Sequence, residues 1–203
     1  LDPQETYSLD ELEAPEGYVR LKEFDVSQPG TPGRHRLAVK NTQVTISKED
    51  LGGQEVKDAH MSVIEKDTGK TVDAWISDGS SHAIINLEEG KEYILHENLA
   101  PAGYAKANDI PFTPGKENLH LSMKDVETTI EKIDDESSPL SGVTFEIMDE
   151  EGNVVDTLIS DGTEQKLSNL TVGKTYTLKE TAGLNGYYGI KEKVFTVEKE
   201  NDL

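Results

Sequence analysis

Short stretches of alternating apolar and polar residues run along the whole chain, separated by turns rich in Gly, Asp, Asn and Pro. Examples are the segments 44–48, 61–65, 93–97 and 119–125. Because side chains two residues apart share one face of a strand, this period is typical of half-buried β-strands. No stretch of useful length has the period of a helix. The pattern therefore predicts an all-β protein of short strands, arranged as a β-sandwich.

Two motifs recur along the chain, and this predicts tandem repeats. The first is Tyr-x-Leu-x-Glu, followed after six residues by a second Tyr. Its glutamates are Glu11, Glu97 and Glu180, at intervals of 86 and 83 residues. The second is Ile-x-Lys-x-Asp, whose lysines Lys48 and Lys132 lie 84 residues apart. The repeating unit is therefore about 84 residues long.

These intervals divide the chain into one complete and two partial units. Residues 43–126 form the complete unit, 1–42 contain the end of a preceding one, and 127–203 begin another that lacks its last strand. The junctions at Thr42 and Val126 leave almost no linker. Because short linkers restrict the motion of neighbouring domains, we expect a stiff rod.

Composition excludes several partners. The formal net charge is −20, from 40 acidic and 20 basic residues, and a field of this sign repels nucleic acid and anionic lipid. No apolar run exceeds four residues, so we expect no membrane insertion in this segment. Cysteine is absent, so disulfides cannot stabilise such small units. The histidines and acidic runs have no metal-site spacing, and we expect no metal and no cofactor.

Three ionisable residues of the complete unit occupy positions that the alternation assigns to the interior. Lys48, Glu97 and Asp125 each end an apolar stripe and share its face. Burial disfavours charged forms, and a neutral lysine amine is a nucleophile. A protonated Glu97 can polarise the Asp125 carbonyl and transfer protons to the leaving water. The pattern indicates a self-formed amide bond between Lys48 and Asp125; a buried cluster without a covalent bond is the alternative.

The partial units repeat this arrangement in part. In each, the ionisable or amide residue ends a predicted strand whose inward face is mostly apolar. In the first unit these faces are Tyr7, Leu9 and Glu11, and Leu37, Val39 and Asn41; in the last they are Thr128, Ile130 and Lys132, and Tyr176, Leu178 and Glu180. The exchange of Asp for Asn at the acceptor position is informative, because a salt bridge needs a carboxylate whereas an acyl acceptor can be either residue. With Asn41 the leaving group is ammonia instead of water.

Three segments together resemble the Cna B-type domains of Gram-positive adhesins and the SpaA-like domains of sortase-assembled pilins. The stretch from Tyr93 to Tyr104 is similar to the E-box of that family. The resemblance covers essentially the whole chain and implies an immunoglobulin-like, or prealbumin-like, β-sandwich. The segments are Ile46-Ser-Lys48-Glu-Asp50, Tyr93-Ile-Leu-His-Glu97 continuing to Tyr104, and His120-Leu-Ser-Met123-Lys-Asp125.

The resemblance also implies roles for the singled-out residues. Lys48 and Asp125 correspond to the partners of an isopeptide bond, and Glu97 corresponds to its catalyst. Glu11 and Glu180 correspond to the catalysts of the partial units. We expect the acceptor of Lys132 near position 209 and the lysine partner of Asn41 before residue 1, so both partners lie outside this sequence.

The sequence thus predicts a structural stalk module of an extracellular, cell-wall-anchored adhesin or pilin, whose partners are neighbouring repeats of the same polypeptide. Direct binding of a host extracellular-matrix protein is the alternative, and it requires an exposed aromatic or apolar patch. Turnover of an external substrate is disfavoured, because the reactive groups point into the core and are consumed by their own single reaction.

Overall fold

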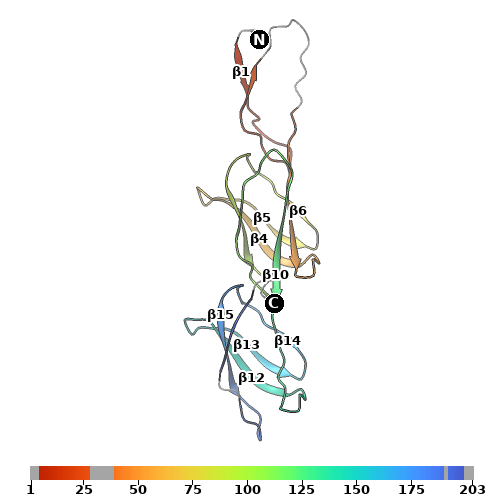
Figure 1. The fold of residues 1–203 in the computed structure, drawn as a ribbon, viewed down its shortest axis with the longest axis vertical. Helices are drawn as coiled ribbons and strands as arrows, with labels where there is room; N and C mark the ends of the chain where they lie inside the picture. Colours follow the sequence, from red (N-terminus) through yellow and green to blue (C-terminus); the bar gives the residue numbers. More distant parts are fainter. Residues whose placement is uncertain (1–4, 28–38, 190–191, 199–203) are drawn as a thin grey trace.

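The computed structural model describes residues 5–27, 39–189 and 192–198. Every regular element in these ranges is a β-strand, and the strands form units stacked end to end in an elongated molecule (Figure 1). The predicted all-β architecture is confirmed. We call 1–42 the first unit, 43–126 the middle unit and 127–203 the third unit; these boundaries stay a prediction. The described residues include no helix able to cross a membrane.

The middle unit is a sandwich of two four-stranded sheets. One sheet has the order β6-β3-β10-β8, with β6 at His82–Ala83, β3 at Val44–Asp50, β10 at Leu119–Glu127 and β8 at Tyr104–Ala105. The other has the order β5-β4-β7-β9, with β5 at Thr71–Asp78, β4 at Lys57–Glu65, β7 at Tyr93–Leu99 and β9 at Ile110–Phe112. Strands β3 and β10 are the first and last of the unit, and they pair in parallel.

The core of the middle unit lies between its two sheets. Alternation places Val44 and Ile46 of β3, and Tyr93 and Leu95 of β7, in one buried apolar cluster. The Tyr93 hydroxyl accepts a hydrogen bond from the Glu88 amide, so this large side chain is buried without an unpaired polar atom. The inward faces predicted for these strands are those that the structure shows.

The third unit contains a four-stranded sheet that corresponds to the sheet β5-β4-β7-β9 of the middle unit. Its four strands have the order β13-β12-β15-β16, at Val154–Asp161, Ser141–Met148, Thr175–Ala182 and Lys193–Thr196. A small second sheet pairs β11, Thr129–Ile130, with β14, Gln165–Lys166. A separate apolar cluster fills the space between them. The described part of this unit has no counterpart of β10.

The first unit differs from its prediction. Strands β1 (Thr6–Leu9) and β2 (Phe24–Ser27) form an isolated antiparallel pair. Leu9 and Val39 were expected to point inward, yet they are 43% and 50% exposed. The physical reason is that the described residues of this unit contain no opposing sheet, so alternation has no interior to face. Leu37, which the alternation also assigned to the inward face, lies outside the described ranges.

Candidate functional site

The structure brings Lys48 and Asp125 into direct contact inside the middle unit. Lys48 lies on β3 and Asp125 on β10, the two parallel neighbours of one sheet. The Lys48 ammonium donates a hydrogen bond to Asp125 Oδ1. Their side chains are 2% and 0% exposed, so this pair is shielded from water. Such a contact places a nitrogen nucleophile beside a carboxyl group.

Glu97 approaches the pair from the opposite sheet. It lies on β7, where its side chain is 0% exposed, and its Oε1 is 3.0 Å from Lys48 Nζ. Its other oxygen, Oε2, accepts a hydrogen bond of 2.7 Å from the Ala107 amide. One carboxyl oxygen therefore faces the lysine while the other is held by the backbone, which fixes the orientation of the group.

The site holds one basic group against two acidic groups. If all three were ionised, an excess negative charge would be buried without compensation, which is costly. Burial raises the pKa of Asp125 to about 7; the Lys48 charge opposes this rise and the Glu97 charge adds to it. Glu97 Oε1 and Asp125 Oδ2 are buried without a hydrogen bond, although Glu97 Oε1 lies within ion-pair distance of Lys48 Nζ. A proton shared by the two carboxyls gives both atoms a partner, so the site favours retaining one.

The third unit contains two of the three groups. Lys132 Nζ lies 3.7 Å from Glu180 Oε2, and the two side chains are 11% and 5% exposed. Lys132 follows the short strand β11 and Glu180 lies on β15. The structure therefore brings the predicted lysine and glutamate of this unit together, as it does in the middle unit.

The first unit contains the predicted acceptor, Asn41, and the predicted glutamate, Glu11. The Asn41 side-chain amide donates to Glu11 Oε1 and Oε2 at 2.8 and 2.9 Å, and to the Val19 carbonyl at 3.2 Å. Glu11 Oε2 also accepts from the Leu21 amide at 2.8 Å. Asn41 lies outside the regular strands, although the alternation assigned it to one. The predicted acceptor and glutamate nevertheless meet.

Sequence reasoning missed the backbone donors. In both units the amide ten residues after the glutamate holds its carboxylate: Leu21 for Glu11 and Ala107 for Glu97. Every residue except proline has an N–H, so no residue type marks this role. A signal did exist, because Tyr-apolar-basic-apolar follows the E-box glycine at both Tyr18 and Tyr104.

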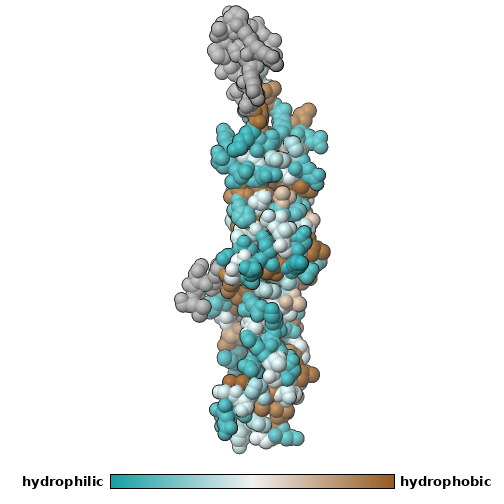
Figure 2. Space-filling view, turned by 90° about the vertical axis from the view of Figure 1, so that its right-hand side faces the viewer, coloured by the Kyte–Doolittle hydropathy of each residue, from teal (hydrophilic) through white to brown (hydrophobic). Residues whose placement is uncertain are grey.

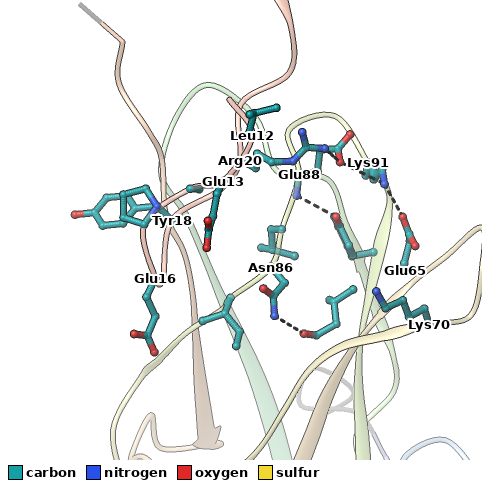
Figure 3. Close-up of a pocket in the computed structure, with 17 residues that line it drawn as sticks. Leu12, Glu13, Glu16, Tyr18, Arg20, Glu65, Lys70, Asn86, Glu88 and Lys91 are labelled. Atoms are coloured by element: carbon teal, nitrogen blue, oxygen red, sulfur yellow. Dashed lines mark hydrogen bonds and ion pairs between the residues drawn. The ribbon is translucent and has the colours of Figure 1, made fainter. Parts of the chain in front are cut away.

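A cleft of about 470 Å³ lies where the first unit meets the middle unit (Figure 3). Arg20 and Lys91 both pair with Glu88 across it, and Lys91 also pairs with Glu65 at 2.9 Å. These four charged side chains therefore pair with one another. No cluster able to hold a metal ion occurs in ranges 5–27, 39–189 and 192–198.

The chain is thus a tandem-repeat protein of two-sheet units, and its middle unit buries a lysine between two carboxyl groups. The model of the family "SpaA: Prealbumin-like fold domain" matches residues 42–127 and 126–203. The chain belongs to this family. A search of curated proteins gives no match.

Solved structures are similar at low identity. The shaft pilin SpaA from Lactobacillus rhamnosus GG is 16% identical, with 77% of this chain and 93% of that chain covered and a TM-score of 0.36. A streptococcal ancillary pilin is 16% identical, with 98% and 72% covered and a TM-score of 0.41. The Bacillus anthracis TIE protein is 24% identical, with 95% and 39% covered and a TM-score of 0.34.

Proposed function

We propose that this chain is a structural stalk segment of a Gram-positive surface pilin or adhesin, and that one isopeptide bond between Lys48 and Asp125 stabilises it. The observation that carries the proposal is the buried contact of these two side chains with Glu97 beside them. Membership of the SpaA prealbumin-like family supports the stalk role and an extracellular, cell-wall-anchored location.

The reaction needs only the three side chains. The Lys48 ammonium first transfers a proton to Glu97, so that the neutral amine attacks Cγ of a protonated Asp125. A C–N bond forms and the C–O bond to the hydroxyl breaks, while Glu97 gives its proton to that hydroxyl and takes one from the amine. The products are an amide, one water and a protonated Glu97, so the Lys48 and Glu97 charges are lost together. The reaction runs once per chain, so the protein does not act on an external substrate.

Burial favours this reaction in three ways. The raised pKa of Asp125, about 7, makes its neutral acid accessible near neutral pH, and that form is the better acceptor. The packed core also holds the reacting atoms in contact, which replaces a bimolecular encounter with an intramolecular one. Exchange of one buried charge pair for a neutral amide removes part of the cost of burying ions.

The bond would close a loop of 77 residues. By the chain-entropy relation used for disulfides, such a closure stabilises the folded state by roughly 4–5 kcal/mol. It also joins the first strand of the unit to the last. For a cysteine-free protein this is a staple that reducing agents do not open.

Direct binding of a host matrix protein has weaker support. It requires a contiguous exposed apolar or aromatic patch. Among the described residues, the exposed large apolar side chains are instead spread over all three units, and the aromatic ones among them are Tyr18, Tyr187 and Tyr188. The face shown in Figure 2 is largely hydrophilic, with apolar residues in small separate groups. The partners that the proposal names are therefore neighbouring repeats.

The intact mass of the denatured full chain tests the cross-link. We expect a mass one water below the value calculated from the sequence. Lys48→Ala should restore the full mass, because the nucleophile is gone. Lys66→Ala is the matched control, since Lys66 is exposed and should leave the deficit unchanged. A wild-type chain at its full sequence mass would rule out the bond.

A further inference from the structure

Three consecutive residues, Ala105, Lys106 and Ala107, connect the candidate site to the next unit. Successive backbone groups of an extended chain point in opposite directions. Ala105 pairs with Val126 of β10, directly after Asp125. Ala107, facing the same way, donates its N–H to Glu97 Oε2. The backbone of Lys106 therefore points away from the site, towards the third unit.

Lys106 is held by the third unit through two hydrogen bonds. Its N–H donates to the Leu170 carbonyl at 2.7 Å, and its carbonyl accepts from the Val172 amide at 3.0 Å. The side chains on either side are divided between the cores. Ala105 belongs to the apolar cluster of the third unit, whereas Ala107 belongs to that of the middle unit. Both units thus hold the short segment that orients Glu97.

The first junction has the same arrangement. The Arg20 amide donates to the Leu87 carbonyl, and the Arg20 carbonyl accepts from the Glu89 amide, both at 2.8 Å. The next residue, Leu21, holds Glu11. The preceding residue, Val19, is buried in the core of the middle unit. We call the two backbone hydrogen bonds that Arg20 or Lys106 forms with the following unit a latch. At both junctions the latch lies directly beside the amide that holds an E-box glutamate.

The side-chain contacts at the two junctions differ, while the backbone latch is common to both. At the first junction Arg20 pairs with Glu88 beside the cleft (Figure 3). At the second, Lys166 of the third unit pairs at 2.6 Å with Glu127, the last residue of β10, and lies over the Tyr104 ring of the middle unit, 5.3 Å from its centroid. The recurring element is thus the backbone ladder at Arg20 and Lys106.

Without the third unit, the Lys106 N–H and carbonyl lose both partners, and Ala105 loses the core that buries it. Strand β8 has only two residues and pairs only with the end of β10, so the direction of the Ala107 N–H then depends on that pairing and on the packing of the Ala107 methyl group in the middle unit. Loss of that N–H frees the Glu97 carboxylate to rotate away from Lys48. Because proton transfer depends on this orientation, the reaction slows.

We propose that the third unit is a positioning element for the Lys48–Asp125 reaction: its docking on Lys106 aims the Ala107 amide at Glu97, so cross-linking of one unit depends on folding of the next. This rests on the proposed isopeptide function. Residues 170–172 contact none of the reacting groups, yet they would change the rate at which the Lys48–Asp125 bond forms in the neighbouring unit.

The test uses the full chain with Leu170→Asp. Leu170 is buried in the core of the third unit, so a carboxylate there undocks that unit while every residue of 43–126 stays unchanged. Chains are made in a short cell-free pulse and quenched in acid denaturant, and the fraction lacking one water is followed by mass. Amide exchange at Lys106 reports docking. Trp75, the single tryptophan, reports folding of the middle unit.

We expect Leu170→Asp to expose the Lys106 amide, leave Trp75 emission unchanged and slow water loss by about tenfold or more, the effect of losing a hydrogen bond to a charged group. Leu170→Ile should restore the wild-type rate, because it preserves the core volume. Ile159→Asp adds the same charge at an exposed position of the third unit and should leave the rate unchanged.

Three results would overturn the positioning role: an exposed Lys106 amide with a wild-type rate, a slow rate with that amide still protected, or altered Trp75 emission, which would indicate a requirement for folding only. A wild-type chain that never loses water would overturn the isopeptide bond itself, and the positioning role with it. The mass of the wild-type chain therefore separates the two failures.

Discussion

Lys48 lies opposite Met123, not Asp125, in the parallel register of β3 and β10. Asp125 is two residues further along and therefore on the same face, so the long lysine side chain reaches it diagonally. A slip of one residue between the strands would turn Asp125 away from the core. The contact thus depends on strand register as well as on the two residue types.

Replacing Glu97 with Gln should slow the cross-link by about 10²–10⁴-fold, because the amide keeps the shape of the side chain but cannot transfer the proton. The measurement is the time course of water loss by intact mass after a synthesis pulse. Glu117→Gln is the matched control, since that side chain is 88% exposed. A wild-type rate in Glu97→Gln would remove Glu97 from the mechanism.

The rate should depend on pH through Asp125. Its pKa is raised to about 7, mainly by burial. Below that pH the carboxyl holds a proton and can be attacked; above it, the carboxylate resists the amine. Water loss should therefore be fastest below about pH 7 and fall by about tenfold for each unit above it.

Asp125→Asn provides the control for this dependence, because its amide does not titrate and it places in the middle unit the acceptor found at Asn41. We expect loss of ammonia in place of water, without the decline near pH 7. The same inflection in both chains would assign the dependence to another group.

Under tension the cross-linked unit should not extend fully. The segment between Lys48 and Asp125 spans 77 residues, a length of about 250–280 Å when fully stretched. Single-molecule pulling from the two ends should show a step of this size in Lys48→Ala and not in the wild type. If both chains show it, the bond is not formed.

Gly103→Ala should loosen the second junction. Gly103 has a φ of +86°, and an added Cβ would lie 2.5 Å from Lys166 Cδ. The left-handed conformation alone costs about 1–2 kcal/mol in a residue with a side chain. We expect exchange at the Lys106 amide to rise by about five- to thirty-fold.

Gly115→Ala is the control for this substitution, because no atom lies within 4 Å of its added Cβ. It should leave exchange at Lys106 unchanged. Equal effects of the two substitutions would mean that the approach of Gly103 to Lys166 does not determine the stability of the junction.

The two-residue period was sufficient to place Lys48, Glu97 and Asp125 in the interior, because the middle unit is a closed sandwich in which one strand face has no access to water. The same rule failed for Leu9 and Val39. Alternation states which residues share a face, but whether that face is buried depends on an opposing sheet, which the local pattern does not encode.

The strand register and the Ala107 donor could not be read from the pattern either. The pairing of β3 with β10 joins residues more than 70 positions apart, and parallel and antiparallel pairing give the same alternation. The hydrogen bond from Ala107 belongs to the backbone, so its partner is chosen by tertiary packing alone. Both features are long-range consequences of the fold.

Val19 and Ala105 each complete the core of the unit that follows them. The sequence repeat and the hydrophobic core are therefore offset, because the cores of the middle and third units each include a side chain of the preceding unit. An array of this kind behaves as a one-dimensional chain with nearest-neighbour coupling, in which the loss of one member weakens its neighbours. The coupling has a direction. The core of a unit includes a side chain from the preceding unit, whereas the orientation of Glu11 and of Glu97 depends on the docking of the following unit.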